Sequence, residues 1–280
     1  MDNPNDSILK RYPLTMYFIL AFAITWLILS PGVASTLGLL DLQFEGTVLT
    51  IMGGLGPLLA ALMVTRATQG QTGVRKMLRS MFSRQVQARW WAAAVLLLAS
   101  LFAIATALGM LTGGAAPDPR AGVYLDGGNL VVVVLLLLVG SFGEEPGWRG
   151  FALPRLQKGR SPLKATLILT LVWWLWHLPT YWTLPFAMGA VQQYGFVAAF
   201  GIQFVVLFIL SILCTWVYNG SRGVVLMPVL LHASWNFWSG AFGQEASVFF
   251  LPLVLLTTIV VGFVTKGQLG FAAGDEATRR

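Results

Sequence analysis

Long apolar stretches separated by short polar gaps organise this sequence. A membrane-spanning helix needs about 20 mostly apolar residues, because each residue adds about 1.5 Å of rise. The fourth stretch is longer than this and chemically mixed, so we expect it to be strongly tilted or broken. The pattern predicts an all-α fold, a polytopic membrane bundle of about eight transmembrane helices, at residues 14–33, 48–65, 90–111, 129–156, 163–182, 196–218, 223–241 and 247–265.

The composition agrees with a lipid environment. Of the 280 residues, 56% are hydrophobic and only 10% are charged, whereas soluble domains carry about 25% charged residues. The net charge of +7 does not indicate nucleic-acid binding, because the basic residues lie in the short gaps between apolar stretches. The single cysteine, Cys214, can form no internal disulfide. We therefore predict an integral, multi-pass membrane protein, located in the plasma membrane if the host is a bacterium.

The basic residues also predict how the helices are oriented. Lys10 and Arg11 precede a first apolar run that is longer than the apolar core of a signal peptide, so we expect a retained helix. With both termini in the cytoplasm, the outer loops hold one basic residue, Arg120, and a second, Arg149, falls within the fourth stretch. The positive-inside rule favours this arrangement, since the predicted cytoplasmic segments hold Lys10, Arg11, Arg66, Arg75, Lys76, Arg79, Arg84, Arg89, Arg155, Lys158, Arg160, Lys164, Arg222, Lys266, Arg279 and Arg280. We expect a single transmembrane domain over residues 1–280.

A few polar residues interrupt the apolar stretches. Ionisable side chains within a membrane are costly and usually mark a functional site. Both histidines of the chain are among them. We predict a site formed by Glu144, Glu145 and Arg149 in the fourth stretch, His177 in the fifth, and His232 with Asn236 in the seventh.

The acidic pair lies directly before a proline. Pro146 disfavours helical dihedral angles at Glu145 and removes one backbone donor. The chain is therefore expected either to kink here or to start a new helix at Pro146, whose dipole would favour the ionised carboxylates. On a helix, Glu145 can pair with Arg149 four residues later, while Glu144 points about 100° away and stays free for other work. In a purely structural alternative, both acids only neutralise Arg149.

The histidines lie at helical spacing from other polar or aromatic groups. Trp173 precedes His177 by four residues on one helix face, and His232 precedes Asn236 in the same way. A ring nitrogen and an amide can together stabilise an oxyanion, and a carboxylate with an imidazole can activate water. Counted along their predicted helices, Glu144, His177 and His232 lie roughly 14–21 Å from the cytoplasmic end, close to one level. Structural hydrogen bonds within the bundle are the alternative for each histidine.

At these residues the sequence resembles the CPBP family of intramembrane endopeptidases (CAAX protease and bacteriocin processing, also called Abi). Its pattern is Glu-Glu-x-x-x-Arg, then Phe-x-x-x-His, then His-x-x-x-Asn or Asp. Here Glu144-Glu145-Pro-Gly-Trp-Arg149 matches the first motif and His232-Ala-Ser-Trp-Asn236 the third. Trp173-Trp-Leu-Trp-His177 matches the second, with tryptophan in place of phenylalanine. The core that carries the resemblance spans residues 141–238.

The resemblance implies an enzyme that hydrolyses a peptide bond of a membrane-associated substrate, as in the processing of CAAX tails. Glu144 would be the general base on water, His177 would help to position it, and His232 with Asn236 would form the oxyanion hole. Glu145 and Arg149 would have supporting roles, and Trp173 would keep an aromatic wall beside the histidine. In a zinc alternative, Glu144, His177 and His232 supply three ligands. No His-Glu-x-x-His motif is present, and we favour no cofactor because the histidines suit the water and oxyanion roles.

Two other functions remain open at this stage. A membrane binding protein or bacteriocin-immunity protein on the same fold would hold a partner without turnover. A proton-coupled transporter would relay charge through the buried groups, but it predicts inverted repeats and paired broken helices, and only one stretch is clearly interrupted. The predicted partners are the lipid bilayer and a peptide or membrane-anchored protein substrate. A prenylated substrate is not expected from a bacterial host, and the sequence leaves the oligomeric state open.

Overall fold

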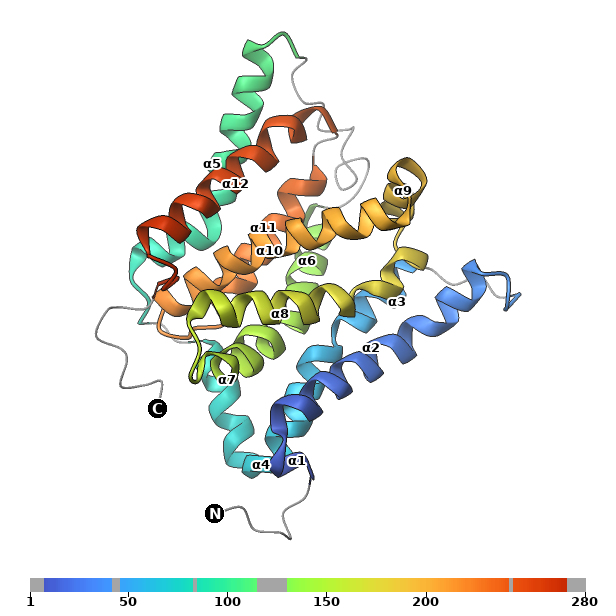
Figure 1. Cartoon of the computed structure of the whole chain (residues 1–280), viewed down its shortest axis with the longest axis vertical. Coiled ribbons are helices and arrows are strands. Elements are labelled where there is room, and N and C mark those ends of the chain that lie inside the picture. The colour runs from blue at the N-terminus through green and yellow to red at the C-terminus, as the bar shows by residue number, and fades with distance from the viewer. Residues whose placement is uncertain (1–7, 42–45, 83–84, 115–129, 242–243, 271–280) are drawn as a thin grey trace.

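A computed structural model describes residues 8–41, 46–82, 85–114, 130–241 and 244–270 of the chain. These residues form helices joined by short connections, and none of them lies in a strand (Figure 1). The elements are α1 Ile8–Arg11, α2 Pro13–Thr36, α3 Gly46–Gly54, α4 Gly56–Met81, α5 Ala88–Leu111, α6 Leu130–Glu145, the π-helix η1 Pro146–Ala152, α7 Leu153–Gln157, α8 Pro162–Trp176, the 3-10 helix η2 Leu178–Trp182, α9 Pro185–Tyr194, α10 Phe196–Gly220, α11 Leu226–Ala241 and α12 Gln244–Val264.

Each of the eight predicted stretches coincides with helical structure, and the prediction of a polytopic helical membrane bundle is confirmed. Within the described residues, four segments are long and apolar enough to cross a membrane by themselves: Pro13–Thr36, Val48–Met81, Ala88–Leu111 and Phe196–Gly220. The helices that carry the candidate site are shorter, with 16 residues in α6, 15 in α8 and 16 in α11. Helix α9 was not predicted.

Helix α6 and its continuation η1 lie between two groups of helices. On one side they contact α3 and α4, which pack with α2, and on the other side α6 contacts α11, which packs with α5 (Figure 1). Helices α8 and α10 pack against each other, and α10 also contacts α11. Large apolar side chains cover the outside of the bundle, including Val197 and Phe263, which are both 85% exposed. Such a surface suits lipid.

Two glycines allow α6 and η1 to pack closely on the neighbouring helices. A Cβ atom at Gly143 would lie 2.5 Å from the carbonyl oxygen of Gly54, and one at Gly147 would lie 2.6 Å from that of Pro57. Backbones come this close in membranes where residues are small. The contact holds the backbone on both sides of the two glutamates against α3 and α4.

The helix changes type at Pro146 without an interruption. The π-helix η1 begins at Pro146, yet Glu145 keeps helical dihedral angles (φ −61°, ψ −36°). Glu145 therefore keeps the helical dihedral angles that Pro146 was expected to disfavour. Because helical turns precede the carboxylates, the free helix N-terminus expected at this point does not form either. Proline removes a backbone donor, and a local π-helix accommodates that loss in a continuous helix.

Candidate active site

A buried network of charged groups joins η1 to α11 and α10. One oxygen of Glu145, Oε1, accepts a hydrogen bond from Nη1 of Arg149 at 2.7 Å and another from Nδ1 of His232 at 2.9 Å. The other terminal nitrogen of Arg149 donates to the hydroxyl of Ser211 at 3.1 Å. Glu145 and Arg149 are fully buried, and His232 is buried as well. The predicted pairing of Glu145 with Arg149 is thus confirmed, and His232 extends it across helices.

The preceding glutamate has a different environment. Glu144 is half-buried, and its Oε2 accepts a hydrogen bond from the indole nitrogen of Trp173 at 2.7 Å. The sequence predicted that Glu144 would stay free for other work and did not predict this bond to Trp173. Its second oxygen, Oε1, accepts no hydrogen bond from the described part of the chain. Glu144 is therefore anchored through one oxygen and keeps the other for a reacting molecule.

His177 caps the end of α8, where Pro179 follows. Its Nδ1 lies 2.8 Å from the carbonyl oxygen of Trp173, one turn back. A carbonyl oxygen can only accept, so Nδ1 carries a proton, and in its neutral form the ring presents the lone pair of Nε2. The half-buried ring also lies within electrostatic range of Glu144 and His232. The position after the last helical turn thus fixes both the tautomer and the orientation of this imidazole.

Trp173 stands at the centre of the predicted residues. Its ring centroid lies 5.4 Å from that of His177 and 5.4 Å from that of His232. The guanidinium carbon of Arg149 lies over the same ring at 4.6 Å, a cation–π distance. With the bond to Glu144, this fully buried indole contacts residues of all three motifs.

Asn236 lies on the same face of α11 as His232, one turn later, and is half-buried. Its side chain makes no hydrogen bond to the other candidate residues within the described chain. In His232, Nδ1 is bound to Glu145, so only Nε2 is left to face a ligand. The structure therefore brings together Glu144, Glu145, Arg149, Trp173, His177 and His232, while Asn236 shares their neighbourhood only through its helix.

Sequence reasoning missed two residues of this region. Ser211 lies within a long apolar helix, and a single serine there carries no signal that it binds Arg149. Tyr17 on α2 is fully buried against Gly147, where a Cβ atom would lie 2.5 Å from the phenol oxygen. Both contacts join helices that are distant in sequence, so only the tertiary structure reveals them.

The predicted zinc alternative fits this arrangement poorly. Within the described residues, no group of three or more His, Cys, Asp or Glu side chains is placed to hold a metal ion. Hydrogen bonds to protein groups hold Nδ1 of both histidines and Oε2 of Glu144, which leaves Nε2 of each ring and Oε1 of Glu144 as the possible ligand atoms. Because their residues are not gathered into such a group in the described part of the chain, we derive no step through a metal.

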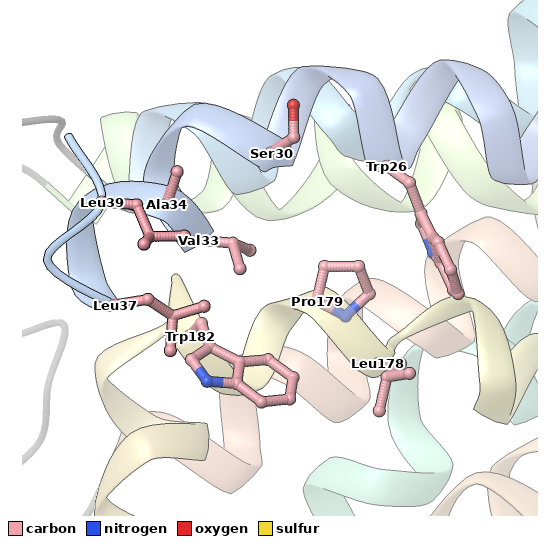
Figure 2. Close-up of a pocket in the computed structure, with 9 residues that line it drawn as sticks. All are labelled: Trp26, Ser30, Val33, Ala34, Leu37, Leu39, Leu178, Pro179 and Trp182. Atoms are coloured by element: carbon pink, nitrogen blue, oxygen red, sulfur yellow. The ribbon is translucent and has the colours of Figure 1, made fainter.

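An apolar pocket adjoins the site beyond His177. It has a volume of about 280 Å³ and lies between the C-terminal half of α2 and η2. Figure 2 shows the side chains that line it: Trp26, Ser30, Val33, Ala34, Leu37, Leu39, Leu178, Pro179 and Trp182. The indole nitrogen of Trp26 donates to the carbonyl oxygen of Trp176 at 3.1 Å, which ties this wall to the end of α8.

The fold and the site define a multi-pass membrane protein with acid–base groups gathered inside its helices. The family described as type II CAAX prenyl endopeptidase Rce1-like matches residues 126–238. The chain is also 22% identical to CAAX prenyl protease 2 of Methanococcus maripaludis over 229 residues, which cover 79% of this chain and 82% of that protein. Both comparisons support the resemblance to the CPBP family of intramembrane endopeptidases that the three motifs predicted. This similarity supports a protease of the membrane.

Proposed function

We propose that the chain is an intramembrane endopeptidase that hydrolyses a peptide bond of a membrane-associated substrate with a water molecule activated by Glu144 and His177. One observation carries the proposal. A half-buried carboxylate and a half-buried imidazole of defined tautomer meet around one tryptophan, next to a buried ion network. A positioned acid–base pair of this kind typically accelerates a reaction by about 10²–10⁴-fold.

In the first step, a water molecule lies between Oε1 of Glu144 and Nε2 of His177. Glu144 takes one proton of this water while the oxygen attacks the carbonyl carbon of the scissile peptide. The electron pair of the C=O double bond moves to oxygen and forms a tetrahedral oxyanion. His177 accepts a hydrogen bond from the second water proton and thereby orients the attack.

Nε2 of His232 and the amide of Asn236 stabilise the oxyanion. Because Nδ1 of His232 donates to Glu145, Nε2 can donate as well only when the ring carries both protons. The Glu145 carboxylate stabilises that imidazolium, and Arg149 balances the remaining charge. Hydrogen-bond donors that the fold holds in place stabilise an oxyanion more strongly than water does, because they need not reorient when the charge develops.

In the second step, the C–N bond breaks. The oxyanion returns its electron pair to reform the C=O bond, and the amine leaves with the proton that Glu144 took from water. The products are a new carboxylic acid and a new amine, and Glu144 is again a carboxylate. No cofactor takes part in this sequence.

We further propose that residues 1–280 act as one transmembrane domain with both termini in the cytoplasm, so that substrate reaches the site from that side. The name CAAX prenyl protease 2 of the Methanococcus maripaludis relative supports a substrate whose scissile peptide lies next to a prenylated residue. The pocket between α2 and η2 supports this too, since it offers an apolar surface beside His177.

The test uses the full chain purified in detergent and a panel of quenched peptides, each with and without an isoprenyl group on cysteine. We expect cleavage by the wild type, loss of cleavage in Glu144→Gln and His177→Ala, and full activity in Asp41→Asn, a carboxylate-to-amide control at an exposed position. All variants are compared at equal thermal stability, with and without a zinc chelator.

The outcomes separate the parts of the proposal. Cleavage by Glu144→Gln at the wild-type rate would overturn the assignment of the base. Loss of activity in chelator, restored by added zinc, would replace the metal-free mechanism. If the wild type cleaved no peptide, prenylated or not, the alternative of a non-catalytic membrane binding or immunity protein would replace the enzyme.

A further inference from the structure

Trp173 occupies a position where the family motif has phenylalanine. The two side chains share an aromatic ring, but only tryptophan carries an N–H donor. Here that donor is used: the indole nitrogen lies 2.7 Å from Oε2 of Glu144. This chain therefore has a hydrogen bond to its proposed base that the family's usual residue cannot supply.

The surroundings of the indole fix the direction of its N–H group. Arg149 lies over the ring at 4.6 Å, and the two histidine rings lie at 5.4 Å from its centroid. The carbonyl oxygen of the same residue holds Nδ1 of His177. With no exposed surface left, the ring has no room to turn. Its donor is thus held by contacts from α8, η1 and α11.

A glutamate side chain has three rotatable bonds, and its carboxylate must meet the attacking water in a narrow range of positions. Displacement by about 1 Å can cost about 10²-fold in rate. A bond to Oε2 restricts the carboxylate and leaves Oε1 to accept the water proton. The donor also supplies a charge-assisted hydrogen bond from a fully buried side chain.

We infer that Trp173 is a positioning residue that holds Glu144 through its indole N–H group. This inference rests on the proposed function, since it assigns the residue that orients the base of that reaction. The competing explanation is that Trp173 only fills space and finds an acceptor for its buried N–H. The two explanations differ in what they predict when the N–H is removed and the ring is kept.

The first experiment compares kinetics of Trp173→Phe with Trp148→Phe. Trp148 is fully buried too, but its indole nitrogen has no hydrogen-bond partner in the described part of the chain. We expect kcat of Trp173→Phe to fall about 10- to 100-fold with KM little changed, as for loss of one hydrogen bond to a charged group. Trp148→Phe controls for the lost ring volume and should keep its kcat.

A sharper variant replaces Trp173 by benzothienylalanine, in which sulfur stands in place of the indole N–H and the ring shape is preserved. If this protein loses kcat as Trp173→Phe does, the N–H group is responsible. Wild-type kcat in benzothienylalanine protein that is stably folded would overturn the inference and leave only a packing role.

A second measurement does not depend on turnover. In protein labelled with ¹⁵N at the indole nitrogens, the Trp173 signal is assigned by its loss in Trp173→Phe. We expect Glu144→Gln to move this signal upfield, because an amide oxygen accepts more weakly than a carboxylate. A signal unchanged by Glu144→Gln would overturn the bond itself. If the signal moved but the wild type cleaved nothing, the proposed function would be at fault, and the positioning role would fall with it.

Discussion

Glu144 and Glu145 are neighbours in sequence, yet the structure gives them opposite environments. Glu145 is fully buried, and its Oε1 accepts hydrogen bonds from the Arg149 guanidinium and from Nδ1 of His232. Glu144 is half-buried and accepts one neutral donor. A turn of about 100° per residue separates the two side chains, so that Glu145 meets Arg149 and His232 while Glu144 meets Trp173.

The difference shows how a membrane protein can hold a reactive carboxylate. A charge in hydrocarbon needs compensation, and Glu145 with Arg149 and His232 forms a compensated unit that links η1 to α11. Because this unit neutralises Arg149, the charge of Glu144 is left for chemistry. The comparison predicts that Glu144 chiefly supports activity and that Glu145 chiefly supports the stability of the fold.

The largest effect should follow from Glu144→Gln. The substitution keeps the size of the side chain and its acceptor for Trp173, but it removes the basic carboxylate. We expect peptide cleavage to fall by about 10³-fold or more, with the free energy of unfolding nearly unchanged. Activity is measured in detergent, and stability by denaturant titration of the same preparation. If the free energy of unfolding of Glu144→Gln instead fell by several kcal/mol, the assignment of a catalytic role to Glu144 and a structural role to Glu145 would be wrong.

Glu145→Gln should mainly lower the free energy of unfolding, whereas Glu144→Gln should mainly lower the rate of cleavage. Removing one member of a buried ion pair leaves Arg149 uncompensated and typically costs about 3–5 kcal/mol. We expect the free energy of unfolding to drop by an amount in this range, together with weaker orientation of His232. Glu144→Gln is the matched control, since it makes the same chemical change one residue earlier. Equal stability of the two variants would remove the basis for calling Glu145 structural.

The sequence predicted part of this arrangement because part of it is local. Glu145 and Arg149 are four residues apart on one helix, and such spacing pairs them in any helical bundle. The apolar stretches likewise predicted the helices, since hydrocarbon leaves a spanning chain few alternatives. Four-residue spacing also placed Trp173 beside His177.

The remaining features depend on contacts between distant segments. His232 lies 87 residues from Glu145, and Trp173 lies 29 residues from Glu144, so neither bond follows from spacing. The π-helix was missed because the rule for residues before proline is a local one. Here Gly143 and Gly147, on both sides of this point, pack closely on α3 and α4, and the chain stays helical between them. Hydropathy also marks apolar length rather than helix ends, so it did not indicate that α8 ends at Trp176.

The smallest effect is expected at Ser211, which lies at the edge of the buried network around Glu145. Ser211→Ala removes the hydroxyl that accepts from Arg149 and leaves one buried N–H without that partner. We expect the free energy of unfolding to fall by about 1–3 kcal/mol, with cleavage reduced much less than in Glu144→Gln. Ser80→Ala is the control, because within the described residues that exposed hydroxyl bonds only to the carbonyl oxygen of Met77 in its own helix. A stability change no larger than in the control would mean that Glu145 and His232 brace Arg149 without α10, and the network that carries the fold would end at η1 and α11.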